Sequence, residues 1–271
     1  MPPVVRSVTL RGGLRLPYVE HGDANGAPVL LLHGVTDSWR SFEPVLPHLP
    51  PAIRAFALTQ RGHGDADRPA AGYRTRDYAT DVIAFADALS LDSFVIVGHS
   101  MGATNAERVA IDHPERVRGL VLAATFTGYR RNPVVMDFWR TAVAPLVDPI
   151  EPAFVQAFQE GTLARPVPAE FVDLVVGESL KVPARVWRAT FEGFLDDDVV
   201  AELHRIAAPT LIVWGDRDAL CPRADQSALR AAIAGARLVV YEGAGHAVHW
   251  EEPRRFARDL EAFVRDLAPA V

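Results

Sequence analysis

One segment constrains the fold of this chain more than any other, because an apolar run leads directly into a serine flanked by glycines. The run spans residues 94–97 and is followed by Gly98, Ser100 and Gly102. This pattern predicts a strand, a sharp turn that carries Ser100, and then a helix. Glycines on both sides leave room for the tight turn. We therefore expect the Ser100 hydroxyl to point outward.

The rest of the chain predicts an α/β architecture. Short apolar, β-branched runs alternate with helical patterns, which favours a mostly parallel sheet covered by helices on both faces. Strands are expected at residues 29–32, 54–58, 95–97, 120–122, 211–214 and 238–241. Helical spacing of apolar residues recurs at Tyr78, Val82, Phe85 and Leu89 and at Phe256, Leu260, Phe263 and Leu267. We interpret both stripes as core packing.

A region without strand signals interrupts this alternation. Residues 127–207 show helical patterns separated by prolines, which predicts a helical cap inserted into a core made of residues 1–126 and 208–271. The region is rich in aromatic side chains. From it and from the core we predict four side chains that line an apolar pocket: Trp39, Phe126, Trp139 and Trp187.

Charge and composition narrow the function. The net charge is −6, with no block of Lys or Arg, so we expect no nucleic-acid partner and no membrane partner. The first residues lack a charged and apolar leader, and no apolar run could span a bilayer, which favours a cytoplasmic protein. The single cysteine, Cys221, is expected to fill a buried gap, and no His/Cys cluster predicts a metal. The sequence leaves a homo-oligomer open.

Ser100 could act as a nucleophile only with a base and an orienting acid nearby. His246 lies in a glycine-flanked loop after the strand expected at 238–241, and Asp216 and Asp218 follow the strand expected at 211–214. Acids at the carboxyl edge of such a sheet lie where ligands bind. His249 is the weaker candidate base because it lacks flanking glycines.

Taken together, five motifs resemble the α/β-hydrolase fold serine hydrolases with a helical cap, in their esterase, lactonase and haloperoxidase-like branch. The motifs are His33-Gly34-Val35-Thr36, Gln60-Arg61-Gly62-His63-Gly64, Gly98-His99-Ser100-Met101-Gly102, Gly215-Asp216-Arg217-Asp218 and Gly243-Ala244-Gly245-His246. The resemblance covers nearly the whole chain. It implies an α/β-hydrolase fold with a mostly parallel eight-stranded sheet flanked by helices and with an inserted cap.

The same resemblance implies site roles. Ser100 would be the nucleophile, His246 the base and Asp218 the acid that pairs with it. The backbone N–H groups of Val35 and Met101 would stabilise an oxyanion. The implied reaction is hydrolysis of a carboxylic ester or lactone of a small, largely apolar substrate through an acyl-enzyme, with no metal and no cofactor.

Other members of this fold remain as alternatives. Epoxide hydrolases and haloalkane dehalogenases carry an aspartate at the position of Ser100, which counts against both. Hydrolases that cleave C–C bonds of ring-fission diketones keep the serine but often have asparagine at the position of His99, for which we expect a packing role. Cofactor-free haloperoxidases keep the whole triad. Some ligand receptors and signalling proteins of this fold keep it too.

Overall fold

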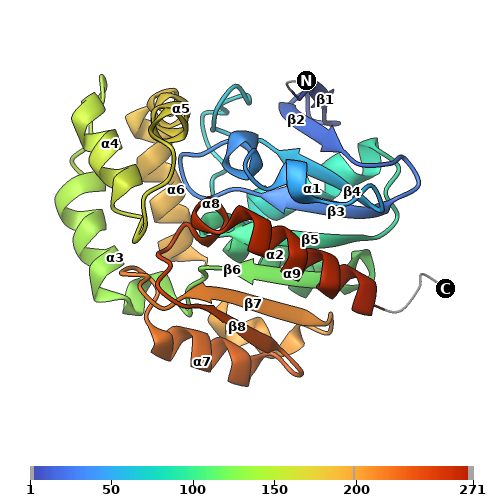
Figure 1. The fold of residues 1–271 in the computed structure, drawn as a ribbon. Coiled ribbons are helices and arrows are strands. Elements are labelled where there is room, and N and C mark those ends of the chain that lie inside the picture. Colours follow the sequence, from blue (N-terminus) through green and yellow to red (C-terminus); the bar gives the residue numbers. More distant parts are fainter. Residues whose placement is uncertain (1–2, 198, 268–271) are drawn as a thin grey trace.

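The computed structural model describes residues 3–197 and 199–267, which form one eight-stranded sheet with helices on both faces (Figure 1). The strand order is β1-β2-β4-β3-β5-β6-β7-β8. β2 runs antiparallel to β1 and to β4, whereas the pairs from β4 through β8 are parallel. The strands are β1 (Val5–Thr9), β2 (Arg15–His21), β3 (Ala27–Leu32), β4 (Ile53–Leu58), β5 (Phe94–His99), β6 (Val117–Ala123), β7 (Thr210–Gly215) and β8 (Arg237–Tyr241).

The predicted α/β-hydrolase fold with a mostly parallel sheet is confirmed. The strand ranges predicted from the sequence fall within β3 to β8. No range was predicted for β1 or β2. β1 lies at the edge of the sheet and four of its five residues are exposed, so it lacks the apolar pattern of a buried strand.

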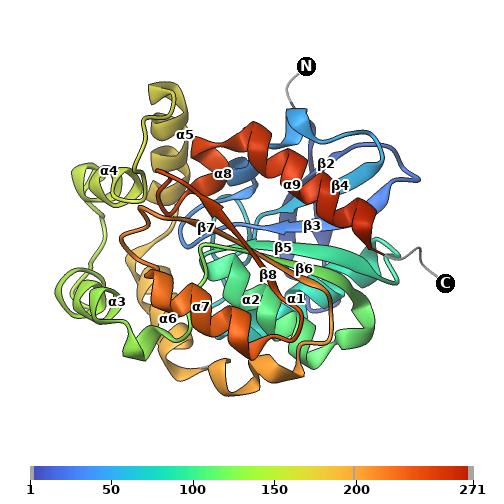
Figure 2. The same ribbon diagram turned by 60° about the horizontal axis from the view of Figure 1, so that its bottom comes forward.

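Helices cover the two faces of the sheet in separate groups. The helices that flank the sheet are α1 (Thr75–Ala88), α2 (Met101–Asp112), α7 (Arg223–Ala232), α8 (Val248–Glu251) and α9 (Pro253–Asp266). Figure 2 shows α1, α2 and α7 on one side and α9 on the other. Along β3, Leu30 and Leu32 join the core beneath α1 and α2, and Val29 and Leu31 join the core beneath α9. Burial on both faces explains the continuous apolar run of this strand.

The remaining α-helices belong to the chain segment that connects β6 to β7. These inserted helices are α3 (Pro133–Phe138), α4 (Pro152–Glu160), α5 (Ala169–Leu180) and α6 (Ala184–Asp196), and they gather at one side of the sheet (Figure 1). A 3-10 segment, Val200–Arg205, follows them and packs its Leu203 into the core beneath α2. This segment lies within the predicted cap range 127–207 but contacts the sheet core. None of the helices described is long and apolar enough to cross a lipid bilayer.

The start of α2 lies unusually close to the end of β3. Leu32 of β3 pairs with Gly98 of β5, and a Cβ atom on Gly102 would lie 2.2 Å from the carbonyl oxygen of Leu32. No such contact is tolerated between real atoms, so only glycine allows α2 to begin here. The close contact brings the loop after β3 beside the turn that carries Ser100.

We predict that Gly102→Ala lowers the free energy of unfolding by about 3 kcal/mol or more, because the new methyl group overlaps backbone that cannot rotate away. Urea unfolding followed by circular dichroism measures the change. Gly177→Ala is the matched control: this exposed glycine of α5 has open space around its Cβ position, and the change should stabilise the protein by about 0.5–1 kcal/mol. Equal stability of Gly102→Ala and the wild type would contradict the packing argument.

Candidate active site

Ser100 occupies a strained turn between β5 and α2. Its backbone angles are φ +52° and ψ −116°, a conformation that costs a residue with a side chain about 1–3 kcal/mol. The surrounding hydrogen bonds hold it there: its N–H donates to the carbonyl of Ala123 at 3.0 Å, and its carbonyl accepts from the N–H of Ala103 at 2.9 Å. The turn places Ser100 among the residues that line a cavity.

His246 and Asp218 form a buried hydrogen-bonded pair. The Nδ1 atom of His246 lies 2.9 Å from Oδ2 of Asp218, and Oδ1 of Asp218 accepts from the N–H groups of Leu220 and Cys221 at 2.8 and 2.9 Å. Burial raises the pKa of Asp218, but the charge of His246 and these hydrogen bonds outweigh burial and hold the pKa below its usual value. An ionised Asp218 can only accept, so the proton resides on Nδ1 and leaves Nε2 of His246 as the basic atom.

The loop that carries His246 is held by the inserted region. The backbone N–H groups of His246 and Ala247 donate to the carbonyl of Thr162 at 2.9 and 3.2 Å. Thr162 follows α4 and lines the cavity. The position of His246 therefore depends on contacts from the inserted region as well as on β8, which precedes its loop.

The loop after β3 is fixed by His33. Its Nε2 accepts from the N–H of Gln60 at 3.0 Å, so its Nδ1 carries the proton and donates to the carbonyl of Gly34 at 2.7 Å. Burial, with the nearby His63, lowers the pKa of His33 well below its usual value and keeps this ring neutral. Since the Gly34 carbonyl and the Val35 N–H belong to one planar peptide, the ring also sets the direction of that N–H.

The two predicted oxyanion donors are the N–H groups of Val35 and Met101. Val35 lines the cavity, and Met101 is the first residue of α2, where N–H groups have no partner within the helix. Within the residues that the structure describes, neither N–H has an acceptor. Both groups are thus available to a ligand.

The two other histidines near Ser100 have neighbours of their own. His99 lines the cavity, and its Nε2 donates to the carbonyl of His246 at 3.1 Å. The His249 ring lies 4.4 Å from that of His99, and its Nε2 lies 3.0 Å from Oγ of Ser41. Burial lowers the pKa of His99 to about 3 and that of His249 well below its usual value. Among the described residues, no acid is hydrogen-bonded to His249 as Asp218 is to His246.

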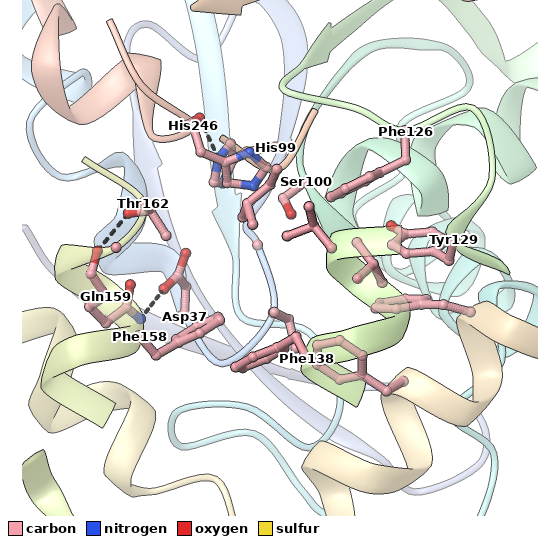
Figure 3. Close-up of a pocket in the computed structure, with 18 of the residues that line it drawn as sticks. Asp37, His99, Ser100, Phe126, Tyr129, Phe138, Phe158, Gln159, Thr162 and His246 are labelled. Carbon is pink, nitrogen blue, oxygen red and sulfur yellow. Dashed lines mark hydrogen bonds between the residues drawn. The ribbon is translucent and has the colours of Figure 1, made fainter. Parts of the chain in front are cut away.

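The cavity has a volume of about 240 Å³ and is mostly apolar. Loops at the strand ends form one part of its wall, and α3, α4 and α6 form another. Figure 3 shows Ser100 and His246 with Phe126 and Tyr129 on one side and Asp37 and Gln159 on the other. Its aromatic lining residues are Phe126, Tyr129, Phe138, Phe158, Phe191, Phe194 and Trp250.

Of the four predicted pocket residues, Phe126 lines the cavity and three tryptophans lie elsewhere. Trp39 packs into the core beneath α9. Trp187 is fully buried and contacts the rings of Phe154 and Phe158, so it joins α6 to α4. The ring of Trp139 stacks on the ring of Phe191 and is not among the residues that line the cavity in the described part of the chain. The prediction that these three rings line the cavity is corrected, because Trp39 packs in the sheet core and Trp139 and Trp187 pack between helices.

Polar lining residues that the sequence did not predict include Asp37 and Gln159. Asp37 lies two residues after Val35, and Gln159 is one of the two buried residues of α4. Both line the cavity and both are almost fully buried. The proximity of Asp37 to the motif His33-Gly34-Val35-Thr36 could have drawn attention to it. Nothing in the sequence distinguishes Gln159, because its orientation depends on how α4 packs.

Asp37 is a buried carboxyl group with neutral partners. Its Oδ1 accepts from Nε2 of Gln159 at 3.0 Å and its Oδ2 accepts from Oγ of Ser41 at 3.2 Å. Burial raises the pKa of Asp37 to about 7, although both hydrogen bonds and His246 oppose the rise, while Glu178 adds to it. Burial thus brings the titration of this carboxyl group much closer to neutral pH than that of an exposed aspartate.

One set of donor atoms near the site could be considered for a metal among the described residues: Asp218, Cys221 and His246, within 4.8 Å of one another. The Cys221 Sγ lies 3.3 Å from the carbonyl of Ala124 and donates to it. Burial raises the pKa of this thiol well above its usual value. Metal binding requires a thiolate, so the protonated thiol suits packing better than ligation.

Comparison with known proteins identifies the family. A family model described as alpha/beta hydrolase fold matches residues 27–253, so the chain belongs to this family and is a hydrolase of the α/β-hydrolase superfamily. A non-heme chloroperoxidase from Streptomyces lividans is 30% identical over 278 residues, covering 96% of this chain and 99% of the relative. A 2-(acetamidomethylene)succinate hydrolase from Mesorhizobium japonicum is 28% identical, covering 93% and 92%.

Solved structures agree with the fold. An esterase from Exiguobacterium antarcticum superimposes with a TM-score of 0.87 at 24% identity, covering 97% of this chain and all of the other. An enol-lactonase from Burkholderia xenovorans gives a TM-score of 0.81 at 20% identity, covering 96% of this chain and all of the other. At these identities the likeness extends to the fold alone.

We predict that Asp37→Asn changes how stability depends on pH. The native pKa of Asp37, about 7, lies above its unfolded value of 3.8, so the native state holds a proton that the unfolded state has lost. Stability contributed by this group is therefore lost as pH rises from about 4 to about 7, by at most about 4 kcal/mol. Relative to wild type, the variant should gain stability between pH 5 and pH 8 in urea unfolding. A constant difference would contradict the burial argument.

Proposed function

We propose that this protein hydrolyses a carboxylic ester or lactone through a Ser100–His246–Asp218 triad. One observation carries the proposal: Ser100, held at positive φ, shares a cavity with a histidine whose Nδ1 is hydrogen-bonded to a buried aspartate. A strained serine beside a base that a third group orients is the arrangement that activates a hydroxyl nucleophile.

In the first half of the reaction, Ser100 Oγ attacks the substrate carbonyl while Nε2 of His246 accepts the hydroxyl proton. Asp218 holds the imidazole in the required tautomer and stabilises the imidazolium that forms. The N–H groups of Val35 and Met101 donate to the oxyanion as it develops. His246 then gives its proton to the leaving alcohol, and the acyl group stays on Ser100.

In the second half, water attacks the acyl-enzyme and His246 accepts its proton. The tetrahedral intermediate collapses, the carboxylic acid leaves and the proton returns to Ser100. Every step uses the chain's own residues and water. The mostly apolar cavity of about 240 Å³ favours a small, largely apolar acyl or alcohol group.

The test is base uptake in a pH-stat across aliphatic esters, aryl esters, lactones and ring-fission diketones. We expect the wild type to release acid from an ester or lactone, and Ser100→Ala and His246→Ala each to lower kcat at least about 10³-fold, because the two residues act as one unit. Unchanged urea unfolding curves should accompany both losses. Acid release only from the diketones, or release that survives Ser100→Ala, would contradict the proposal.

A second prediction tests whether Asp218 orients the imidazole of His246. Asp218→Asn keeps the volume of the side chain but presents an amide N–H where His246 needs an acceptor, so the imidazole takes the wrong tautomer. We expect kcat to fall about 10⁴-fold with little change in KM. Asp216→Asn is the matched control, because Oδ1 of Asp216 accepts from the backbone N–H of Gly243, a bond that the amide oxygen of asparagine can also accept. Equal loss in both variants would assign Asp218 a merely structural role.

A further inference from the structure

Asp37 stands out because it is a buried acid in an apolar cavity without a cation beside it. Its side chain lines the cavity and is almost fully removed from solvent. None of the described residues that line the cavity is Lys or Arg, and Asp37 takes part in no ion pair within the described part of the chain. A buried carboxylate normally has such a partner, since its desolvation is costly.

Glu178, another buried acid of this protein, does have cationic partners. Glu178 is similarly buried, and its Oε1 lies 2.8 Å from Nζ of Lys181 and 3.8 Å from Nε of Arg40. Within the described residues, the donors to the carboxyl group of Asp37 are the neutral side chains of Gln159 and Ser41. The fold therefore provides cations to one of these two acids and leaves the other facing the cavity.

The neutral partners of Asp37 belong to a network that fixes its orientation. Nε2 of Gln159 also donates to Oγ of Ser179 at 2.7 Å, and Oγ of Ser179 lies 2.9 Å from Oγ1 of Thr36. Among the described residues, nothing donates to Oε1 of Gln159. Asp37 and Gln159 thus present acceptor atoms at one side of the cavity, opposite Phe126 and Tyr129 (Figure 3).

We propose that Asp37 and Gln159 form a polar subsite that binds a hydrogen-bond-donating group of the substrate, a hydroxyl or an ammonium, away from the carbonyl that is attacked. This inference rests on the proposed function in one respect, namely that the group attacked is an ester or lactone carbonyl. The binding of a donor group by Asp37 and Gln159 does not depend on it. It narrows the substrate class to esters or lactones with an apolar body and one donor group at its far end. Aromatic walls suit such a body and also favour a cation.

Binding to Ser100→Ala protein tests the subsite without turnover. The ligands are ethyl esters with acyl chains from butanoyl to octanoyl, each ending in a methyl, hydroxymethyl or aminomethyl group. Isothermal titration calorimetry measures the affinity of each. At the best chain length, a donor-ended ester should bind at least about 10-fold more tightly than its methyl-ended match, because a hydrogen bond to a charged acceptor offsets the cost of burying the donor.

Further substitutions in Ser100→Ala protein test whether Asp37 and Gln159 cause the preference for donor-ended esters. Asp37→Leu and Gln159→Leu should each weaken binding of the donor-ended ester at least about 10-fold relative to the methyl-ended one. Asp37→Asn keeps the shape and one acceptor, so it should spare the hydroxyl-ended ester and weaken the ammonium-ended one. Phe158→Leu is the matched control from the same cavity wall and should change both affinities by the same factor.

Turnover by the protein with Ser100 intact separates the two proposals. Hydrolysis without any preference for a donor-ended ester, or a preference that survives Asp37→Leu and Asp37→Asn, overturns the subsite and leaves the proposed function standing. Binding preference that depends on Asp37, with no hydrolysis of any ester or lactone, supports the subsite and overturns the proposed function. Binding of none of the esters overturns the subsite. If Asp37→Leu fails to fold, Asp37→Asn and Gln159→Leu decide the matter.

Discussion

The contact between the first turn of α2 and the end of β3 is the constraint on which the site depends. A Cβ at Gly102 would overlap the carbonyl of Leu32, so the two backbones meet at a distance that only glycine permits. This contact sets the loop of Val35 beside the start of α2, directly after the turn in which Ser100 has its positive φ. The nucleophile and both predicted oxyanion donors therefore lie on the two segments that meet at this close backbone contact.

Much of the sheet, and the residues at its carboxyl edge, could be predicted from the sequence, because each motif directly follows a recognisable strand. The runs before Ser100, Asp218 and His246 are apolar and short, and parallel strands bring their carboxyl ends to one edge. The lining of the cavity could not be predicted in the same way. Trp187 and Phe191 lie one turn apart on α6, yet Trp187 packs against α4 and Phe191 faces the cavity. Only the way in which the helices pack decides between them.

Buried polar groups surround the proposed triad and give it a rigid frame. His33 fixes the loop of Val35, His99 donates to the carbonyl of His246, and Thr162 holds the loop of His246 from the inserted region. Burial keeps His33 and His99 neutral, so these two rings position the backbone through hydrogen bonds. In the proposed mechanism His246 is the base. Asp37 differs from them because its acceptor atoms face the cavity.

Covalent labelling of Ser100 tests the central claim most directly. An alkyl fluorophosphonate reacts with a serine only where a neighbouring base and an oxyanion site activate it, and mass spectrometry of the digested protein locates the adduct. The account predicts one adduct, on Ser100, in the wild type, and a labelling rate at least about 10²-fold lower in folded His246→Ala protein. Labelling of another residue, or equal rates in the two proteins, would contradict it.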